Sequence, residues 1–165
     1  MAKHTDILII GGGISGLLTA QELIYAGKTV TLIDQSTPGQ ESSWAGGGIL
    51  LPIYPWRQAD AISQLVTASL NLYPALSQTL CDTTGIDPEL RVCGMLICQN
   101  PDIESAKAWC RRHGIQHQSP SADQLQPLLT TLQDPLWLPE IAQIRNPRLL
   151  KSLLAFLRQR GVHFI

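Results

Sequence analysis

Short apolar runs alternate along the chain with longer amphipathic stretches, and this pattern predicts the elements of the fold. Apolar runs at residues 5–10 and 29–33 predict two strands, and residues 14–26 carry apolar side chains at helical spacing. Gly27 follows as the expected end of that helix. The apolar character of the second run suits a parallel sheet that is buried on both faces. These segments together predict a right-handed βαβ unit.

The same pattern continues to the end of the chain. Helices are predicted over residues 59–80, 102–113, 121–129 and 147–160. Strands are predicted at residues 90–98 and 162–165, and extended structure broken at Pro139 is predicted over residues 136–145. A chain that ends in a four-residue strand after a helix looks interrupted, so we expect a truncated domain.

Local signals indicate where these helices begin and bend. Pro74 should kink or split the helix predicted over residues 59–80. Ser121 and Gln124 have the spacing of a capping box, which predicts the start of a short helix. Asn146 is predicted as an N-cap, with Pro147 in the first helical position.

A glycine-rich turn joins the first strand to the first helix. Gly11, Gly13 and Gly16 form a G-x-G-x-x-G motif. Asp34 lies 18 residues after Gly16, directly behind the second predicted strand. The glycines allow a tight turn, close approach of backbone to a pyrophosphate and close packing of helix on strand. An acid at this distance can accept hydrogen bonds from ribose hydroxyls. The motif therefore predicts a dinucleotide site, and the alternative is a glycine-rich turn without a ligand.

A second glycine-rich stretch lies within the long irregular segment at residues 35–58. Ser42 and Ser43 can donate hydrogen bonds to phosphate or ribose oxygens, and residues 46–48 are three consecutive glycines that let backbone amides approach a ligand. Long loops in compact domains are usually functional. A flexible surface loop is the alternative, but Trp44 and the apolar residues 49–51 argue against it because they favour burial.

Composition and charge narrow the function classes. The chain has 165 residues, 44% of them hydrophobic, and a net charge of −1, which suits one globular domain or parts of two. This charge gives no reason to expect nucleic acid. The sequence has neither an apolar run long enough to span a membrane nor a secretory signal pattern, so we expect a cytoplasmic protein without a membrane span.

Cysteines and histidines show no metal-ligand spacing, and no metal is expected. The cysteines, which we expect to be buried reduced thiols rather than disulfides, are Cys81, Cys93, Cys98 and Cys110. The histidines, which we interpret as structural, are His4, His113, His117 and His163.

Three stretches carry a family resemblance: GGGISGLLTAQELIYAGKTVTLIDQ, ESSWAGGGILLPIYPW and LWLPEIAQIRNPRLLKSLL. Together they resemble the FAD-dependent D-amino-acid oxidase superfamily, and most closely its glycine oxidase branch associated with thiamine biosynthesis. The resemblance covers essentially the whole chain but only the N-terminal part of the family's length. It implies an α/β fold with a Rossmann-type FAD-binding βαβ unit and part of a mixed-sheet substrate domain. By resemblance, residues 1–84 begin the FAD-binding domain, residues 85–135 belong to the substrate domain, and residues 136–165 return to an incomplete FAD-binding domain.

The resemblance also implies which positions bind FAD. The positions implied to hold the pyrophosphate are Gly11, Gly13, Ile14, Ser15 and Gly16. Asp34 and Gln35 are implied at the adenosine ribose, and Ser42 and Ser43 at phosphate or ribitol. Those implied beside the flavin ring are Gly47, Gly48 and Ile49. Many relatives carry Glu where this chain has Asp34; the shorter acid still reaches a ribose and disfavours a 2′-phosphate.

The implied activity is FAD-dependent oxidation of the C–N bond of glycine or a similar small amine. Dioxygen would accept the electrons, and an imine or keto acid, ammonia and hydrogen peroxide would form. Alternatives are a sarcosine-type oxidase or quinone-linked dehydrogenase on the same scaffold, a non-catalytic FAD-binding fragment and, with less support, an NAD enzyme. No position matches the family's substrate-binding arginine and tyrosine, so no catalytic residue is assigned. We expect the 165 residues alone to be inactive, and a homo-oligomer remains open.

Overall fold

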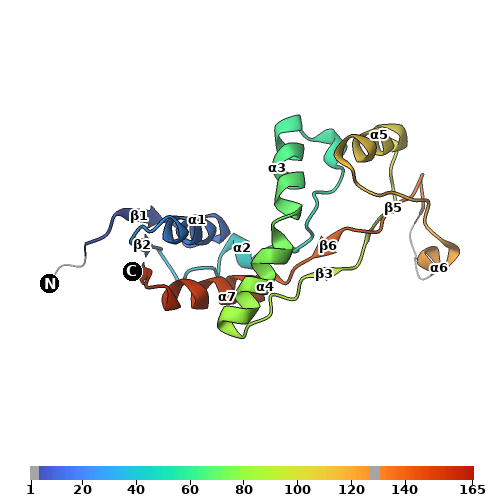
Figure 1. Ribbon diagram of the computed structural model, residues 1–165. Coiled ribbons are helices and arrows are strands. Elements are labelled where there is room, and N and C mark those ends of the chain that lie inside the picture. Colours follow the sequence, from blue (N-terminus) through green and yellow to red (C-terminus); the bar gives the residue numbers. More distant parts are fainter. Residues whose placement is uncertain (1–3, 127–130) are drawn as a thin grey trace. The chain divides into compact units, whose positions relative to one another are not determined.

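The computed structural model describes residues 4–126 and 131–165, and the chain divides into two compact units. Unit 1 contains residues 1–48, 74–89 and 144–165, and unit 2 contains residues 49–73 and 90–143. Figure 1 labels most of the elements of both. The chain thus passes from unit 1 to unit 2 and back twice. Each unit is therefore built from segments that lie far apart in the sequence.

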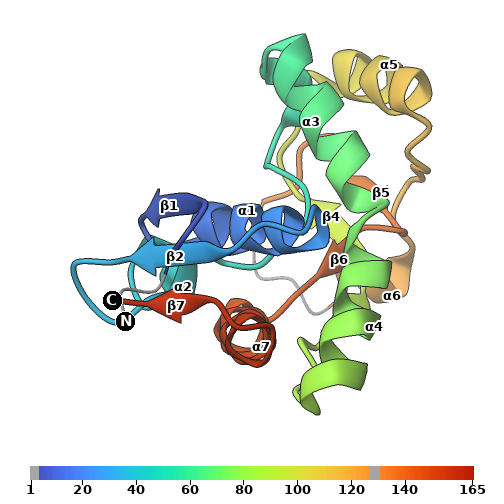
Figure 2. The same ribbon diagram turned by 60° about the vertical axis from the view of Figure 1, so that its left-hand side comes forward.

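Unit 1 is built on a parallel three-stranded sheet. The strands are β1 (Ile7–Ile10), β2 (Val30–Ile33) and β7 (His163–Phe164), and β2 pairs with both of the others (Figure 2). Helix α1 (Ile14–Tyr25) connects β1 to β2, and α7 (Asn146–Gln159) leads into β7. This confirms the predicted βαβ unit, and the α/β fold class with it.

Two helices supply most of the core of unit 1. Helix α7 turns one apolar side inward, and its fully covered side chains are Leu149, Leu150, Leu153, Phe156 and Leu157. Helix α1 buries Leu17 and Ala20, and its Tyr25 ring meets Phe156 edge-on with 6.1 Å between ring centroids. Burying a side chain of this size stabilises a fold by roughly 1.5–3 kcal/mol. The apolar contacts between α1 and α7 therefore help to hold α1 on the sheet.

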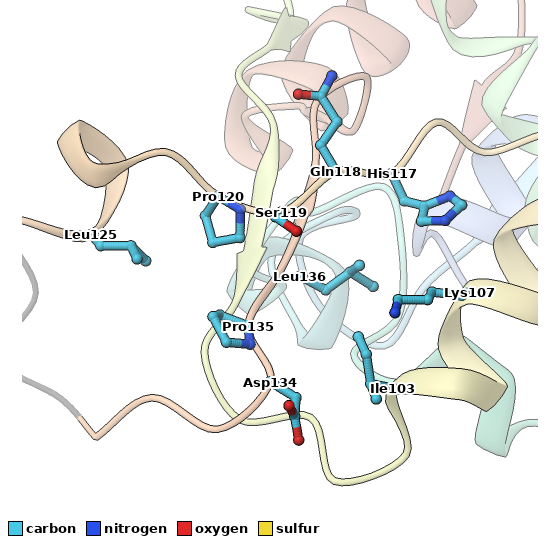
Figure 3. A pocket seen from close by; sticks show the side chains of 10 residues that line it. All are labelled: Ile103, Lys107, His117, Gln118, Ser119, Pro120, Leu125, Asp134, Pro135 and Leu136. Atoms are coloured by element: carbon cyan, nitrogen blue, oxygen red, sulfur yellow. The ribbon is translucent and has the colours of Figure 1, made fainter.

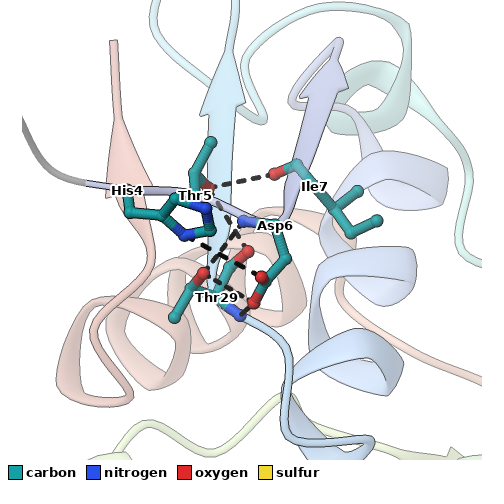
Figure 4. A network of polar contacts seen from close by, with 5 residues as sticks. All are labelled: His4, Thr5, Asp6, Ile7 and Thr29. Carbon is teal, nitrogen blue, oxygen red and sulfur yellow. Dashed lines mark hydrogen bonds and ion pairs between the residues drawn. The ribbon is translucent and has the colours of Figure 1, made fainter.

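A polar network ties the beginnings of β1 and β2 together (Figure 4). The Asp6 carboxylate accepts hydrogen bonds from the backbone N–H and the hydroxyl of Thr29, both at 2.8 Å. The Asp6 N–H donates in return to the Thr29 hydroxyl at 2.9 Å. These bonds lower the pKa of Asp6 below its usual value, because they favour the charged carboxylate.

Unit 2 contains two short antiparallel strand pairs. Strand β3 (Arg91–Val92) pairs with β6 (Ala142–Gln143), and β4 (Met95–Ile97) pairs with β5 (Leu136–Leu138). The prediction of a single strand over residues 90–98 was therefore wrong in one respect, because the segment forms two short strands with a break that includes Gly94. A Cβ at Gly94 would overlap the Trp137 ring, so the indole packs directly on the backbone there.

Helices and a 3-10 turn surround the core of unit 2. They are η1 (Pro55–Arg57), α3 (Asp60–Leu70), α5 (Ile103–His113) and α6 (Ala122–Leu125). The buried Trp109 indole donates a hydrogen bond to the Ser63 hydroxyl at 2.9 Å, which joins α5 to α3. Arg57 forms an ion pair with Asp102. Tyr54 and Trp56 pack against this core.

Several predicted boundaries need correction. The helix predicted over residues 59–80 is split near Pro74, as one of the two expectations had it, into α3 and α4 (Tyr73–Thr84), and α4 ends at residue 84 instead of 80. Pro74 is the second residue of α4. Proline suits a first turn because its missing N–H would have no helical partner there. Asn146 is not the N-cap; Arg145 takes that place and Asn146 is the first helical residue. The segment at residues 35–58 is not wholly irregular, since it contains α2 (Ser42–Ala45) and η1.

Other local predictions are confirmed or fall partly outside the described residues. The Ser121–Gln124 capping box is present and begins α6, whereas residues 127–129 of the predicted helix lie outside the described residues. All four cysteines are free, but only Cys110 is buried and Cys93 is exposed, so uniform burial was wrong. Burial raises the pKa of the Cys110 thiol to about 11. Within residues 4–126 and 131–165, no helix has the length and apolar character to cross a membrane.

Candidate functional site

The glycine turn after β1 is a backbone cradle that excludes side chains. Gly11 has φ +103°, a conformation that residues with a Cβ rarely adopt. A Cβ at Gly16 would overlap the carbonyl oxygen of Gly11, so α1 begins in direct contact with the turn. A Cβ at Gly12 would lie 2.6 Å from Cβ of Pro38. Gly12 occupies a variable position of the motif, and the motif alone therefore did not indicate that it is sterically required.

The first turn of α1 faces a serine from the second glycine-rich stretch. Gly13 is the N-cap of α1 and has no side chain to satisfy the free amides. The Ile14 N–H donates to the Ser43 hydroxyl at 3.0 Å, and a Cβ on Gly13 would lie 3.1 Å from the same oxygen. A 12-residue helix offers unpaired amides and a positive dipole end at its start, which favour an anion. Ser43, one of the two serines predicted at phosphate, thus lies beside Gly13 and Ile14, which were predicted at the pyrophosphate.

Asp34 closes this turn from the end of β2. Its carboxylate accepts hydrogen bonds from the Gly12 N–H at 2.5 Å and from the Ser36 N–H at 2.9 Å. Backbone hydrogen bonds from Ser36, and then from Gly12, lower the pKa of Asp34 below its usual value. Asp34 is therefore ionised at neutral pH. Its negative charge repels a nearby phosphate group, and its oxygens can accept hydrogen bonds from hydroxyl groups.

The second glycine-rich stretch packs against the start of α7. The Ile144 N–H donates to the Gly48 carbonyl at 2.8 Å, and a Cβ at Gly48 would overlap the Ile144 carbonyl oxygen. A Cβ at Gly46 would lie 2.5 Å from Nδ2 of Asn146. Asn146 was singled out only as a cap, whereas its amide lies against the glycine backbone. No local sequence signal could have linked positions separated by a hundred residues.

Other predicted residues are less constrained. Those that are exposed are Ser15, Gln35, Ser42 and Gly47. Ile49 falls at the beginning of unit 2, where it forms an isolated bridge with Gln143 and is 51% exposed. The contacts above therefore group the glycine turn, Asp34 and Ser43, while the assignments to ribose, phosphate, ribitol and flavin ring stay predictions.

Unit 2 has a separate pocket of about 530 Å³ (Figure 3). Its residues include Lys107 and Ile103 of α5, His117, Asp134 and Leu136, and none of the predicted cofactor residues lines it. Lys107 is already paired with Glu104 at 3.1 Å. Among the described residues, no group of three or more histidine, cysteine or acidic side chains could hold a metal ion.

Comparison with known proteins gives consistent matches. Residues 6–165 match the family model described as DAO, FAD dependent oxidoreductase. The chain is 40% identical over 157 residues to a glycine oxidase of Pseudomonas aeruginosa, covering 93% of this chain and 43% of that protein. It is 30% identical over 169 residues to a bifunctional ThiO/ThiG protein of Trichormus variabilis, covering 95% of this chain and 25% of that one.

Solved structures agree. A glycine oxidase from Geobacillus kaustophilus superposes with a TM-score of 0.85 at 25% identity, covering 98% of this chain and 46% of that chain. An L-proline dehydrogenase from P. horikoshii, at 17% identity and a TM-score of 0.74, shares the fold alone. The chain spans less than half the length of the glycine oxidases it matches.

Proposed function

Because the chain belongs to the FAD-dependent oxidoreductase family described by the DAO model, we propose that it supplies the cofactor-binding part of a glycine oxidase-type enzyme. The reaction proposed for the whole enzyme is oxidation of the C–N bond of glycine or a similar small amine. Dioxygen would be the acceptor, and an imine or keto acid, ammonia and hydrogen peroxide the products. The single observation that carries the proposal is the assembly of the glycine turn, Ser43 and Asp34 at the start of α1.

The cradle fits the diphosphate of FAD on steric and electrostatic grounds. Gly13 places no side chain beside the first amides of α1, and the dipole of α1 favours negative charge at the same place. The Ser43 hydroxyl, which accepts from the Ile14 N–H, marks where an acceptor oxygen of a phosphate would bind. We assign the pyrophosphate to residues 11, 13–16 and 43, and the ribose to Asp34. When bound, FAD supplies the electron acceptor for the substrate, which no amino-acid side chain can replace. By the same proposal, unit 1 holds the cofactor and unit 2 contributes to the substrate domain.

The test joins this chain to the part of the Pseudomonas aeruginosa glycine oxidase that follows its matched region, as one polypeptide. We expect the purified chimera to be yellow and to form hydrogen peroxide with glycine in air. Sarcosine, and a quinone acceptor under anaerobic conditions, test the two alternative enzymes. A soluble chimera without flavin absorbance would refute cofactor binding, and one with flavin but no turnover of any of these amines would support a non-catalytic role.

A further inference from the structure

The pocket of unit 2 is lined by segments that backbone hydrogen bonds hold together. Its lining comes from α5, from residues 117–120 that follow it, from α6 and from the start of β5 (Figure 3). The Gln118 N–H donates to the Trp137 carbonyl at 2.9 Å, and the Trp137 N–H donates to the Gln118 carbonyl at 3.0 Å. The capping box at Ser121 begins α6 directly after this segment. The walls of the pocket are therefore in place before a ligand arrives.

The pairing of Gln118 with Trp137 also decides which side chains face the pocket. Two residues paired across antiparallel segments share one face, and their chain neighbours share the other. His117, Ser119 and Leu136 therefore lie on the face opposite to Gln118. Figure 3 agrees, because the side chain of Gln118 points away from that of Leu136. The strand pairing thus turns a hydroxyl, an imidazole and an aliphatic side chain toward the same space.

Much of the pocket surface is apolar. Leu136 is buried in the hydrophobic core of unit 2, and Ile103 packs against the same core. In Figure 3, three further apolar side chains lie to one side of Leu136, and these are Pro120, Leu125 and Pro135. The volume of about 530 Å³ falls within the range of small-molecule pockets, roughly 300–1,000 Å³. A ligand with a sizeable apolar group would therefore gain affinity by burying that group here.

Two opposite charges border this apolar surface. Lys107 extends from α5, and Asp134 lies just before β5. Lys107 pairs with Glu104, but both side chains reach solvent, and an exposed pair of this kind contributes little to stability. The Lys107 ammonium can therefore exchange Glu104 for the carboxylate of a ligand. The Asp134 side chain is exposed and can accept hydrogen bonds from the ammonium group of a ligand.

We propose that the pocket binds a zwitterionic α-amino acid with a large apolar side chain. The carboxylate of the ligand pairs with Lys107, its ammonium group pairs with Asp134, and its side chain lies over Leu136. A simple carboxylic acid would leave Asp134 without a partner, and a simple amine would leave Lys107 without one. Every lining residue belongs to unit 2, and none is among the residues assigned to FAD. Binding here is therefore separate from the proposed flavin site and can be measured without the cofactor.

The test is isothermal titration calorimetry of the purified 165-residue chain with phenylalanine. We expect a Kd below about 1 mM. Two matched analogues each lack one charge: 3-phenylpropanoate has no ammonium group, and 2-phenylethylamine has no carboxylate. Each should bind at least about tenfold more weakly, because it loses one charged contact. Glycine should also bind at least about tenfold more weakly, because it has no apolar side chain to bury, which separates this pocket from a site for the proposed substrate.

Two variants assign the charged contacts. Lys107→Met keeps an unbranched side chain without its charge, and Asp134→Asn keeps the shape of the acid at a position with φ +46°, which asparagine tolerates. Each should raise the Kd of phenylalanine at least about tenfold. The controls Lys151→Met and Glu140→Gln, at exposed residues that do not line the pocket, should leave it unchanged. Asp134→Asn should not weaken 3-phenylpropanoate, because that analogue has no ammonium group.

The outcomes that overturn the proposal are distinct. A Kd for phenylalanine above about 1 mM, or the same Kd in the unsubstituted chain and in both variants, would refute binding in this pocket. Equal affinities for phenylalanine and 3-phenylpropanoate would refute the ammonium contact with Asp134. If the chain alone does not stay soluble, the single-chain chimera is titrated, and a Kd that Lys107→Met leaves unchanged there also refutes the proposal.

Discussion

Replacing Gly16 by alanine tests whether the close contact between α1 and the glycine turn is structural. A Cβ there would overlap the Gly11 carbonyl oxygen, which is backbone and cannot rotate away. Overpacking costs about 1–3 kcal/mol or more, and the rigid neighbour places this case at the upper end. Alanine regains roughly 1 kcal/mol of helix propensity within α1. We therefore expect a net loss of about 2 kcal/mol in the free energy of unfolding.

The assay is urea and thermal unfolding followed by circular dichroism. A loss of this size should lower the midpoint temperature by roughly 4–8 °C in a protein of this length. Gly47→Ala is the matched control, because a Cβ at Gly47 meets nothing within 4 Å. It should leave stability unchanged or raise it by about 0.4–1 kcal/mol through the unfolded chain. If Gly16→Ala unfolds within about 0.5 kcal/mol of the unsubstituted chain, the steric argument for the turn is wrong.

Three further predictions address the cofactor and the charge of the site. The 165 residues alone should bind FAD more weakly than about 1 μM, because most of a family chain is absent; a tighter constant from fluorescence titration would contradict this. Gly13→Val in the chimera should remove bound flavin, because a side chain would occupy the space proposed for the pyrophosphate, and unchanged flavin absorbance would refute that assignment. Asp34 has a lowered pKa when folded, so its stabilising contribution is present above the usual value of 3.8 and is lost as pH falls through the lower folded pKa. The stability difference between the unsubstituted chain and Asp34→Asn should thus shrink below pH 3.8, and a difference that stays constant down to acid unfolding would count against the role of its hydrogen bonds.

Local patterns predicted the βαβ unit and glycine turn of unit 1, and the capping box of unit 2, because these signals are short-range. Each strand, helix, turn or cap is signalled by residues close together in the sequence, where propensity and geometry act directly. The split of residues 59–80 near Pro74 was one of the two expected outcomes, because proline suits a helix start as well as a kink and the pattern alone does not choose between them.

Long-range packing explains the rest of what the sequence left open. Gly46 and Asn146 meet only because the chain returns to unit 1 after passing through unit 2. Cys93 reads as buried within an apolar run, yet it lies in the break between the two-residue strand β3 and β4, where it is exposed. The contact of Gly12 with Pro38 likewise follows from a tertiary approach, which single-sequence reasoning does not contain.

The hydrogen bond between Asp34 and Gly12 has a consequence for affinity. It holds the glycine turn closed before any ligand arrives, so the conformational entropy of ordering the turn is lost on folding and not on binding. A carboxylate has about four acceptor positions, and here the Gly12 N–H, the Ser36 N–H and, at 3.4 Å, the Ser36 hydroxyl already donate to Asp34. The long bond from the Ser36 hydroxyl is the one that a hydroxyl of the proposed sugar would displace. The two backbone hydrogen bonds that hold the turn would then stay in place when the sugar binds.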